Sequence, residues 1–206
     1  MRSHRIASNR AAVIDYVASP QSSTITFHTP TSRHVDTFLR RKCAADILAL
    51  GVMPNTKEIT ESMACYVAAR KHLGLHLSDP TVTAIVVGDG NTPRTAAIFA
   101  YMSAWTVYSI DPRLVHKERY KGVKRLHVVA KKIEDTAVHC DGPAVVVLPH
   151  AHVSVIKTLQ SVIAPVRHVV ALPCCVELQH PATLHVEYTD WGVWSPERLI
   201  RVWRDV

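Results

Sequence analysis

The sequence has no apolar run approaching the ~20 residues that a membrane-spanning helix needs, so we expect no membrane insertion. Its five cysteines form no CxxC pair and show no paired His/Cys spacing. We therefore expect neither a zinc or other metal site nor a disulfide framework. An odd number of cysteines without such a framework indicates an intracellular, reducing compartment, and cytoplasm, nucleus and mitochondrion are not distinguished.

Acidic residues are also scarce. Seventeen Asp and Glu residues stand against 24 Lys and Arg residues, which gives a formal net charge of +7 with the 13 histidines neutral. Such a balance favours an anionic partner, and nucleic acid is the obvious class. Basic residues cluster at 33–42 and at 117–125. A solvated basic surface without a dedicated partner is equally compatible with this pattern.

The first 80 residues differ from the rest in composition and in their pattern of apolar residues. Residues 1–35 are polar, basic and rich in Ser and Thr, and we interpret them as a flexible arm (rather than a mitochondrial-type presequence) with at most one strand, near 23–29. Residues 36–80 predict a helical N-terminal extension. One helix is expected from Asp36 to Gly51, and a second from an N-cap at Asn55 or Thr56 to Gly74.

From residue 81 the sequence alternates short β-branched apolar runs with helical segments. Five runs are typical of buried strands: the 80s, 106–111, 125–131, 143–149 and 167–173. Helices are predicted at 93–104 and 152–163, and the C-terminal stretch predicts an antiparallel hairpin at a sheet edge. This rhythm predicts an α/β, Rossmann-like, doubly wound and mostly parallel sheet over residues 81–206.

The turn after the first of these strands, Gly88-Asp89-Gly90-Asn91-Thr92, carries the most information about function. Glycines permit a tight turn and close approach of a ligand, and Thr92 and Pro93 suit the start of a helix. Asp111 ends the next strand 21 residues after Gly90, where an acid accepts hydrogen bonds from ribose hydroxyls. A purely structural interpretation stays open, in which the glycines only make the bend and Asp111 caps a helix. Pro93 stands where the dinucleotide fingerprint needs glycine, which favours a mononucleoside cofactor over NAD or FAD.

On these residues the sequence resembles the class I S-adenosylmethionine-dependent methyltransferases. VVGDGNT resembles their glycine-rich first motif, Asp111 their ribose-binding acid, and the terminal hairpin their reversed last strand. LPHAHVSV (148–155) and LPCCVELQ (172–179) are similar to motifs of a branch that has Pro-Cys-Cys after strand five and includes RNA-modifying members. Val86 departs from the family pattern, which has an acid two residues before the first glycine, and the connections after strands three and five are short.

The resemblance implies roles for particular residues. Gly88, Asp89, Gly90, Asn91 and Thr92 would hold the methionine end of S-adenosylmethionine, Asp111 its ribose, and Lys132 to Asp135 would flank its adenine. His150 and His152 would face the methyl acceptor, one of them as a general base; alternatively they cap a helix or pack as neutral imidazoles. Cys174 and Cys175 are interpreted as small core residues rather than nucleophiles.

Three hypotheses follow from the sequence. The leading one is an S-adenosylmethionine-binding, methyltransferase-like protein that acts on or is bound to nucleic acid, with RNA favoured. The second is a catalytically inactive methyltransferase-fold scaffold in a ribonucleoprotein or protein complex, which the Val86 departure favours. The third is a small nucleotide-dependent oxidoreductase.

Overall fold

A computed structural model describes residues 3–7, 13–18, 23–175, 178 and 180–206 of the chain. Its main feature is a seven-stranded sheet with the strand order β11-β12-β10-β8-β4-β5-β6. Five strands pair in parallel: β4 (Thr83–Val87), β5 (Thr106–Ile110), β6 (Leu126–Val129), β8 (Ala144–Pro149) and β10 (Arg167–Leu172). β12 (Leu199–Trp203) and β11 (Val186–Thr189) add an antiparallel hairpin at one edge. The predicted Rossmann-like sheet, the presence of its five strands and its terminal hairpin are confirmed, but β6 lies at an edge of the sheet and only one of its four residues is buried.

The strands at the centre of the sheet are covered on both faces. Nearly every residue of β4, β8 and β10 is buried, as continuous Val, Ile and Ala runs require. Helices α1 (Arg33–Leu39), α2 (Ala44–Ala49), α3 (Thr56–His72) and α4 (Arg94–Met102) share one apolar core with the first face. The second face packs with α5 (Val155–Gln160) and the 3-10 turn η2 (Ile133–Asp135).

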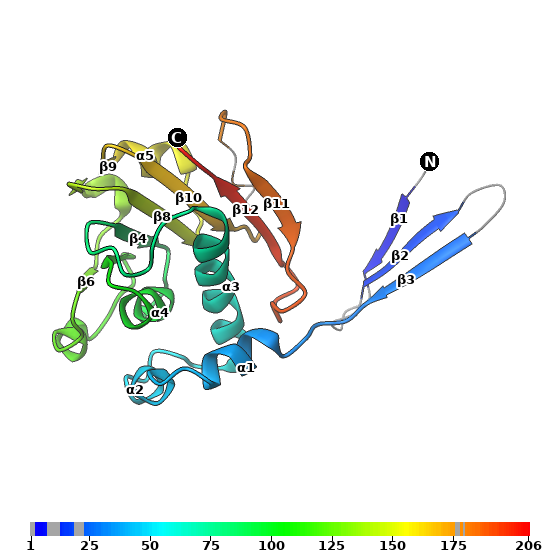
Figure 1. The fold of residues 1–206 in the computed structure, drawn as a ribbon, viewed down its shortest axis with the longest axis horizontal. Helices are drawn as coiled ribbons and strands as arrows, with labels where there is room; N and C mark the ends of the chain where they lie inside the picture. Colours follow the sequence, from blue (N-terminus) through cyan, green and yellow to red (C-terminus); the bar gives the residue numbers. More distant parts are fainter. Residues whose placement is uncertain (1–2, 8–12, 19–22, 176–177, 179) are drawn as a thin grey trace.

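Helix α3 is part of this core rather than a separate attachment. Asn55 caps it as expected, its side chain accepting a hydrogen bond from the N–H of Glu58 at 3.1 Å. Met63, Tyr66 and eight other residues of the helix are buried, and each large apolar side chain buried in this way contributes about 1.5–3 kcal/mol. The helix contacts α4, β8, β10 and β12 and so runs across the sheet (Figure 1).

Three expectations about helices need correction. The predicted helix from Asp36 to Gly51 is two helices, because the chain turns between Leu39 and Ala44. The predicted helix over 152–163 is shortened to α5, and Val162–Ile163 instead forms the strand β9, which pairs with β7 (Val138–His139). Thr92 does not cap α4, because its hydroxyl donates to the Val52 carbonyl at 3.0 Å.

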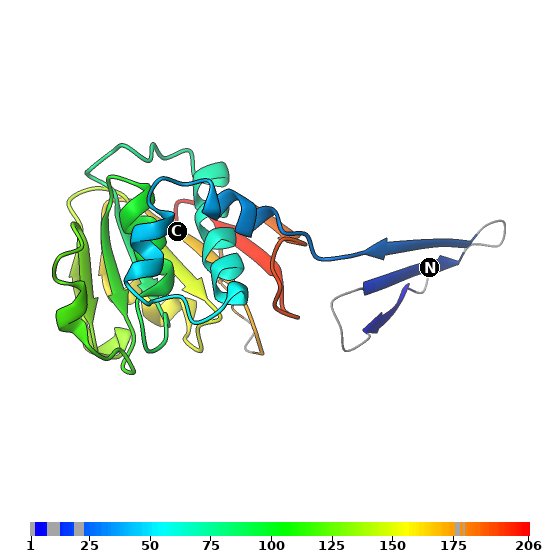
Figure 2. The ribbon, with the colours of Figure 1, turned by 90° about the horizontal axis from the view of Figure 1, so that it is seen from below.

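The N-terminal arm also departs from expectation. The predicted strand near 23–29 is present as β3 (Ser23–His28), but β1 (Ser3–Ala7) and β2 (Val13–Ala18) precede it. The three form an antiparallel sheet in the order β1-β2-β3, where at most one strand was expected. Figures 1 and 2 show this sheet standing apart from the other elements. Among the described residues, no helix is long and apolar enough to cross a bilayer.

Candidate functional site

The two glycines after β4 lie at the carboxyl edge of the sheet in a conformation that other residues avoid. Gly88 and Gly90 have φ angles of 79° and 83°. A Cβ on Gly88 would lie 2.7 Å from the Ala151 Cβ, and one on Gly90 would collide with the Arg94 guanidinium. The first glycine therefore lets the loop after β8 approach the loop after β4.

Asp89, between the glycines, faces inward. Its carboxylate accepts hydrogen bonds from the N–H groups of Thr95 (2.9 Å) and Ala96 (3.1 Å) and from the Ser109 hydroxyl (3.0 Å). Burial raises the pKa of this carboxyl, although these donors act in the opposite direction. Asp89 thus occupies the N-terminus of α4, where its carboxylate satisfies backbone N–H groups that would otherwise be free.

Asp111 lies beside the glycine turn with its side chain almost fully buried. One carboxylate oxygen accepts from the Gly90 N–H at 2.9 Å and the other from the Arg113 N–H at 2.8 Å. The Arg113 side chain is 70% exposed and lies 3.4 Å or more from the same oxygens. Because a carboxylate oxygen has two lone pairs, each one keeps acceptor capacity toward the adjoining space.

That space is a cavity of about 450 Å³. Its polar lining comes from Asp111, Arg113, Lys132, Glu134, His150 and His152. Its remaining lining residues are Gly88 and six apolar residues: Val87, Ile110, Pro112, Ile133, Ala151 and Val153. Lys132 and Asp111 therefore line the same cavity. We name this space the Asp111 cavity.

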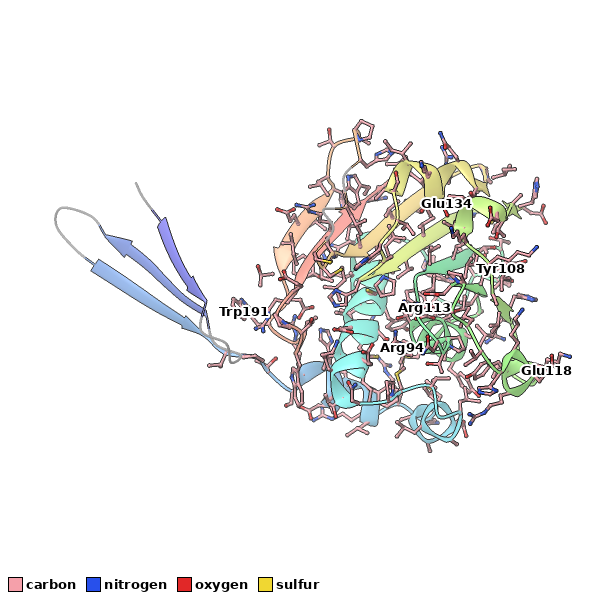
Figure 3. The ribbon with its side chains drawn as sticks, turned by 180° about the vertical axis from the view of Figure 1, so that it is seen from behind. Arg94, Tyr108, Arg113, Glu118, Glu134 and Trp191 are labelled. Atoms are coloured by element: carbon pink, nitrogen blue, oxygen red, sulfur yellow. The ribbon has the colours of Figure 1, made fainter. Side chains whose placement is uncertain are left out.

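A second cavity of about 300 Å³ adjoins it across Gly88, Arg113 and His150, and we name it the Glu61 cavity. Its walls are mostly polar and include several charged side chains, and α3 supplies Lys57, Glu58, Glu61 and Ser62. Arg94 closes one side, donating to the Asp89 carbonyl and forming an ion pair with Glu58 at 2.7 Å. Figure 3 shows Arg94 and Arg113 near one another beside α3 and α4. Asn91 and Thr92 face elsewhere, lining a separate cavity with Gly51 and Val52.

Glu61 and His150 form a pair at the base of this charged wall. The His150 Nε2 lies 3.0 Å from the Glu61 Oε1, which also accepts from the Lys57 ammonium at 2.8 Å. Burial alone would raise the pKa of Glu61, but the hydrogen bonds and charges of His150 and Lys57 outweigh it and lower the pKa to about 2. The other ring nitrogen of His150, Nδ1, is buried and has no partner among the described residues.

The backbone of His150 is also unusual, since a φ of 51° places a non-glycine residue in the left-handed region. Such a conformation costs about 1–3 kcal/mol and is common at functional sites. Sequence reasoning singled out His150 but missed Glu61 and Lys57. A usable signal was present: an acid and a base spaced i, i+4 among the apolar residues of a helix.

The side chain of His152 contacts two cysteines rather than Glu61. Its Nε2 lies 3.0 Å from the Cys174 Sγ and 3.4 Å from the Cys175 Sγ, and the two sulfur atoms are 3.7 Å apart. The cysteines were interpreted as core residues, but Cys174 is only partly buried and Cys175 is exposed. That interpretation is therefore wrong, because Cys174 lines the Glu61 cavity and Cys175 is exposed to solvent.

The second basic segment does not gather at this cleft. Arg125 donates to the carbonyls of Ala100 and Ser103 at the far end of α4, and Arg119 donates to the Leu50 carbonyl. Lys117, Lys121 and Lys124 are exposed along the edge next to β6. Arg125 therefore lies away from the carboxyl edge, because residues 117–125 connect the carboxyl end of β5 to the amino end of β6.

No family model matches the sequence, and no curated protein is similar to it at a significant level. Solved structures are similar in fold. A mutant of MtNAS in complex with S-adenosylmethionine has a TM-score of 0.50 at 8% identity, with 82% of this chain and 69% of that chain covered. DhpI in complex with SAM and HEP has a TM-score of 0.39 at 13% identity, with 84% and 83% covered. A putative methyltransferase of an antibiotic biosynthesis pathway from Anabaena variabilis has 0.39 at 17% identity, and the match covers 52% of this chain and only 44% of that protein.

At these identities the similarity identifies the fold and nothing finer. The strand order, the reversed terminal hairpin and the glycine turn at the carboxyl edge agree with it. The chain has the Rossmann-like fold of the class I S-adenosylmethionine-dependent methyltransferases.

Proposed function

We propose that this chain binds S-adenosylmethionine in the paired cavities and serves as a methyltransferase-type protein whose acceptor is nucleic acid, with RNA favoured. The observation that carries the cofactor proposal is Asp111. Its buried carboxylate, held by two backbone N–H groups, faces a cavity large enough for a nucleoside. An acid fixed in this way can accept hydrogen bonds from both ribose hydroxyls.

The remaining walls of the Asp111 cavity suit a purine. Ile133 and Val153 supply apolar surface for the faces of the ring, and Lys132 and Glu134 supply polar groups at its edge. Pockets that combine apolar walls with a few fixed polar groups are the usual form of nucleoside sites.

The Glu61 cavity suits the zwitterionic methionine end. Val86 leaves the family's usual acid position apolar and buried. Glu61 of α3 supplies a buried carboxylate at the same cleft, beside Gly88. We assign Glu61 the role of the missing acid, toward the amino group of the cofactor, with Lys57 and Arg94 as the nearby cations.

The bound cofactor would supply a methyl group on a sulfonium, and the protein must align an acceptor with it. His150 lines both cavities, and its orientation is fixed by Glu61 at Nε2. Nδ1 then remains as the basic nitrogen of the ring, and because it is buried, the residues that cover it would have to move before it could take a proton from an acceptor. A carboxylate behind the histidine stabilises the imidazolium that results.

Calorimetric titration with S-adenosylmethionine and S-adenosylhomocysteine tests the cofactor proposal, with NADH as the comparison ligand. We expect binding of the first two ligands and a ten- to hundredfold loss in Asp111→Asn, because a hydrogen bond to a charged group is worth about 1.5–3 kcal/mol. Asp141→Asn is the matched control, since Asp141 is exposed near the opposite end of β8. If folded protein bound none of the ligands, the inactive scaffold would be favoured. If it bound NADH, the oxidoreductase would be favoured.

The nucleic-acid proposal rests on charge and on one ring pair. The chain carries a net charge of +7. Tyr108 and His127 stack with ring centroids 4.9 Å apart, in an open cavity of about 650 Å³ that Lys117, Lys121 and Lys124 also line. Stacked rings beside lysines suit a single strand, whose bases stack and whose phosphates pair with ammonium groups.

Fluorescence anisotropy with a single-stranded RNA at several salt concentrations tests this surface. We expect the slope of log K against log salt to fall by about 0.7 in Lys124→Ala, the value for one lost phosphate contact on a single strand. Lys157→Ala, an exposed lysine of α5 that does not line this cavity, should leave the slope unchanged. Equal slopes for the parent, Lys124→Ala and Lys157→Ala would refute the assignment of this surface to RNA binding.

A further inference from the structure

We propose that His152, Cys174 and Cys175 form a binding site for a thiophilic metal ion, Zn²⁺, at the rim of the cleft. The three ligand atoms lie within 4.8 Å of one another. This inference goes beyond the proposed function and does not depend on cofactor binding.

The topology of the sheet brings these residues together. β8 and β10 are parallel neighbours, with Pro149 paired to Leu172 at their carboxyl ends. The His150 N–H donates to the Leu172 carbonyl and extends this alignment into the two loops. His152 and the cysteine pair follow directly, so a 22-residue separation in sequence becomes contact in space.

The spacing of the ligand atoms resembles that of a zinc centre. With Zn–S near 2.3 Å and Zn–N near 2.0–2.1 Å, tetrahedral coordination puts two sulfur atoms about 3.8 Å apart and a nitrogen about 3.6 Å from each sulfur. The sulfur atoms here are 3.7 Å apart, and the nitrogen lies 3.4 Å from one and 3.0 Å from the other. A shift of about half an ångström at His152 therefore suffices to accommodate the ion.

The chemistry of the donors supports the same ion. Two thiolates and an imidazole are a ligand set that zinc proteins use when the fourth position is left open. On binding, both thiols lose their protons to solvent, and no oxidation or reduction takes place. Cys175 is exposed, which gives the ion an entry path. Cys174 lines the Glu61 cavity and His152 the Asp111 cavity, so the ion would lie where the two adjoin.

Titration of the full chain, reduced and stripped of metal, with Zn²⁺ in competition with a chromophoric chelator measures this site. Co²⁺ should in addition produce thiolate-to-cobalt charge-transfer absorption. We expect one ion per chain, and at least tenfold weaker binding in Cys174→Ser, Cys175→Ser and His152→Ala. Cys43→Ser is the matched control because Cys43 is partly exposed but lies outside the cluster. It should bind as the parent does, as should Asp111→Asn.

Thiol alkylation followed by mass spectrometry provides the second measurement. Zn²⁺ should slow alkylation of Cys174 and Cys175 and leave that of Cys43 unchanged. Equal alkylation with and without Zn²⁺ in folded protein would overturn the proposal. So would equal affinity in the parent and the three cluster variants, or a Cys174–Cys175 disulfide in protein prepared with Zn²⁺ present.

Discussion

The Glu61–His150 pair gives this fold a dependence on acid that can be worked out from the structure. The lowered pKa of Glu61 means that the folded state binds its proton less readily than the unfolded chain does. Its contribution to stability is therefore complete above the ordinary value of 4.5 and is lost as the pH falls toward 2. Glu61→Gln removes the titrating group while keeping the size of the side chain.

The expected magnitude follows from the two pKa values. Each tenfold change in proton affinity is about 1.4 kcal/mol, so a decrease from 4.5 to about 2 corresponds to about 3 kcal/mol. Of this, about 2 kcal/mol should be lost by pH 3. Only 4% of the Glu61 side chain is exposed, so screening by solvent reduces the figure little.

Urea unfolding of the parent, Glu61→Gln and a control between pH 7 and pH 3 measures this difference. The free energy of unfolding of the parent should exceed that of Glu61→Gln by up to about 3 kcal/mol at pH 7, and the gap should narrow as the pH falls. The control is Glu118→Gln, which removes an exposed ion pair with Lys121 and should change stability by about 0.5 kcal/mol or less. A gap that stays constant from pH 7 to pH 3 would refute the assignment of the lowered pKa to Glu61.

Two further substitutions test the packing that positions the site. Gly88→Ala should lower the free energy of unfolding by about 2–4 kcal/mol, because a left-handed alanine is strained and its Cβ would collide with Ala151. Gly122→Ala is the control and should be nearly neutral, because nothing lies within 4 Å of the added Cβ. A similar loss of stability in both variants, measured by thermal unfolding, would count against this explanation. Asp190→Asn should cost about 3–5 kcal/mol, because the buried carboxylate pairs with His34 at 3.0 Å and with Arg33. The exposed Asp205→Asn is the comparison in the same denaturation assay, and an equally small change in both would show that the buried network contributes little.

The sheet could be predicted from the sequence because its signal is local. Runs such as Ala144–Pro149 are continuously apolar, and only a strand covered on both faces requires that pattern. The turn at Gly88 and the acid at Asp111 were equally visible, since a glycine turn and a strand-terminal acid are read from adjacent residues.

The boundaries of the helices were harder to predict from the sequence. The stripe from Phe38 to Leu50 continues across the turn between α1 and α2, because both helices bury their apolar residues in the same core. Apolar periodicity reports which residues are buried and does not report a break in the backbone. The Pro-Cys-Cys branch stays a prediction, because the similarity of fold does not distinguish branches.

The candidate site could be predicted only where its residues come from neighbouring strands. Asp89 was assigned to the cofactor because it lies in the turn, but the direction of its side chain depends on the free N–H groups of α4. Glu61 is 89 residues from His150, and the His152–Cys174 contact spans 22 residues. Contacts of this kind are set by how elements pack, and no motif spacing encodes them.

The position of Glu61 changes how the segment before β4 is understood. If α3 only covered the sheet, apolar residues along its buried side would be enough. Instead the helix brings a buried acid, its lysine partner and Ser62 to the cleft. The charged wall of the Glu61 cavity therefore exists only when α3 is docked, so a ligand that uses this wall binds the docked state alone. Such a ligand stabilises the docked state by about 2.7 kcal/mol at a hundredfold excess over its Kd. Docking of α3 and binding of such a ligand are thus two parts of one equilibrium, and the role that we propose for Glu61, in place of an acid at Val86, depends on the fold being complete.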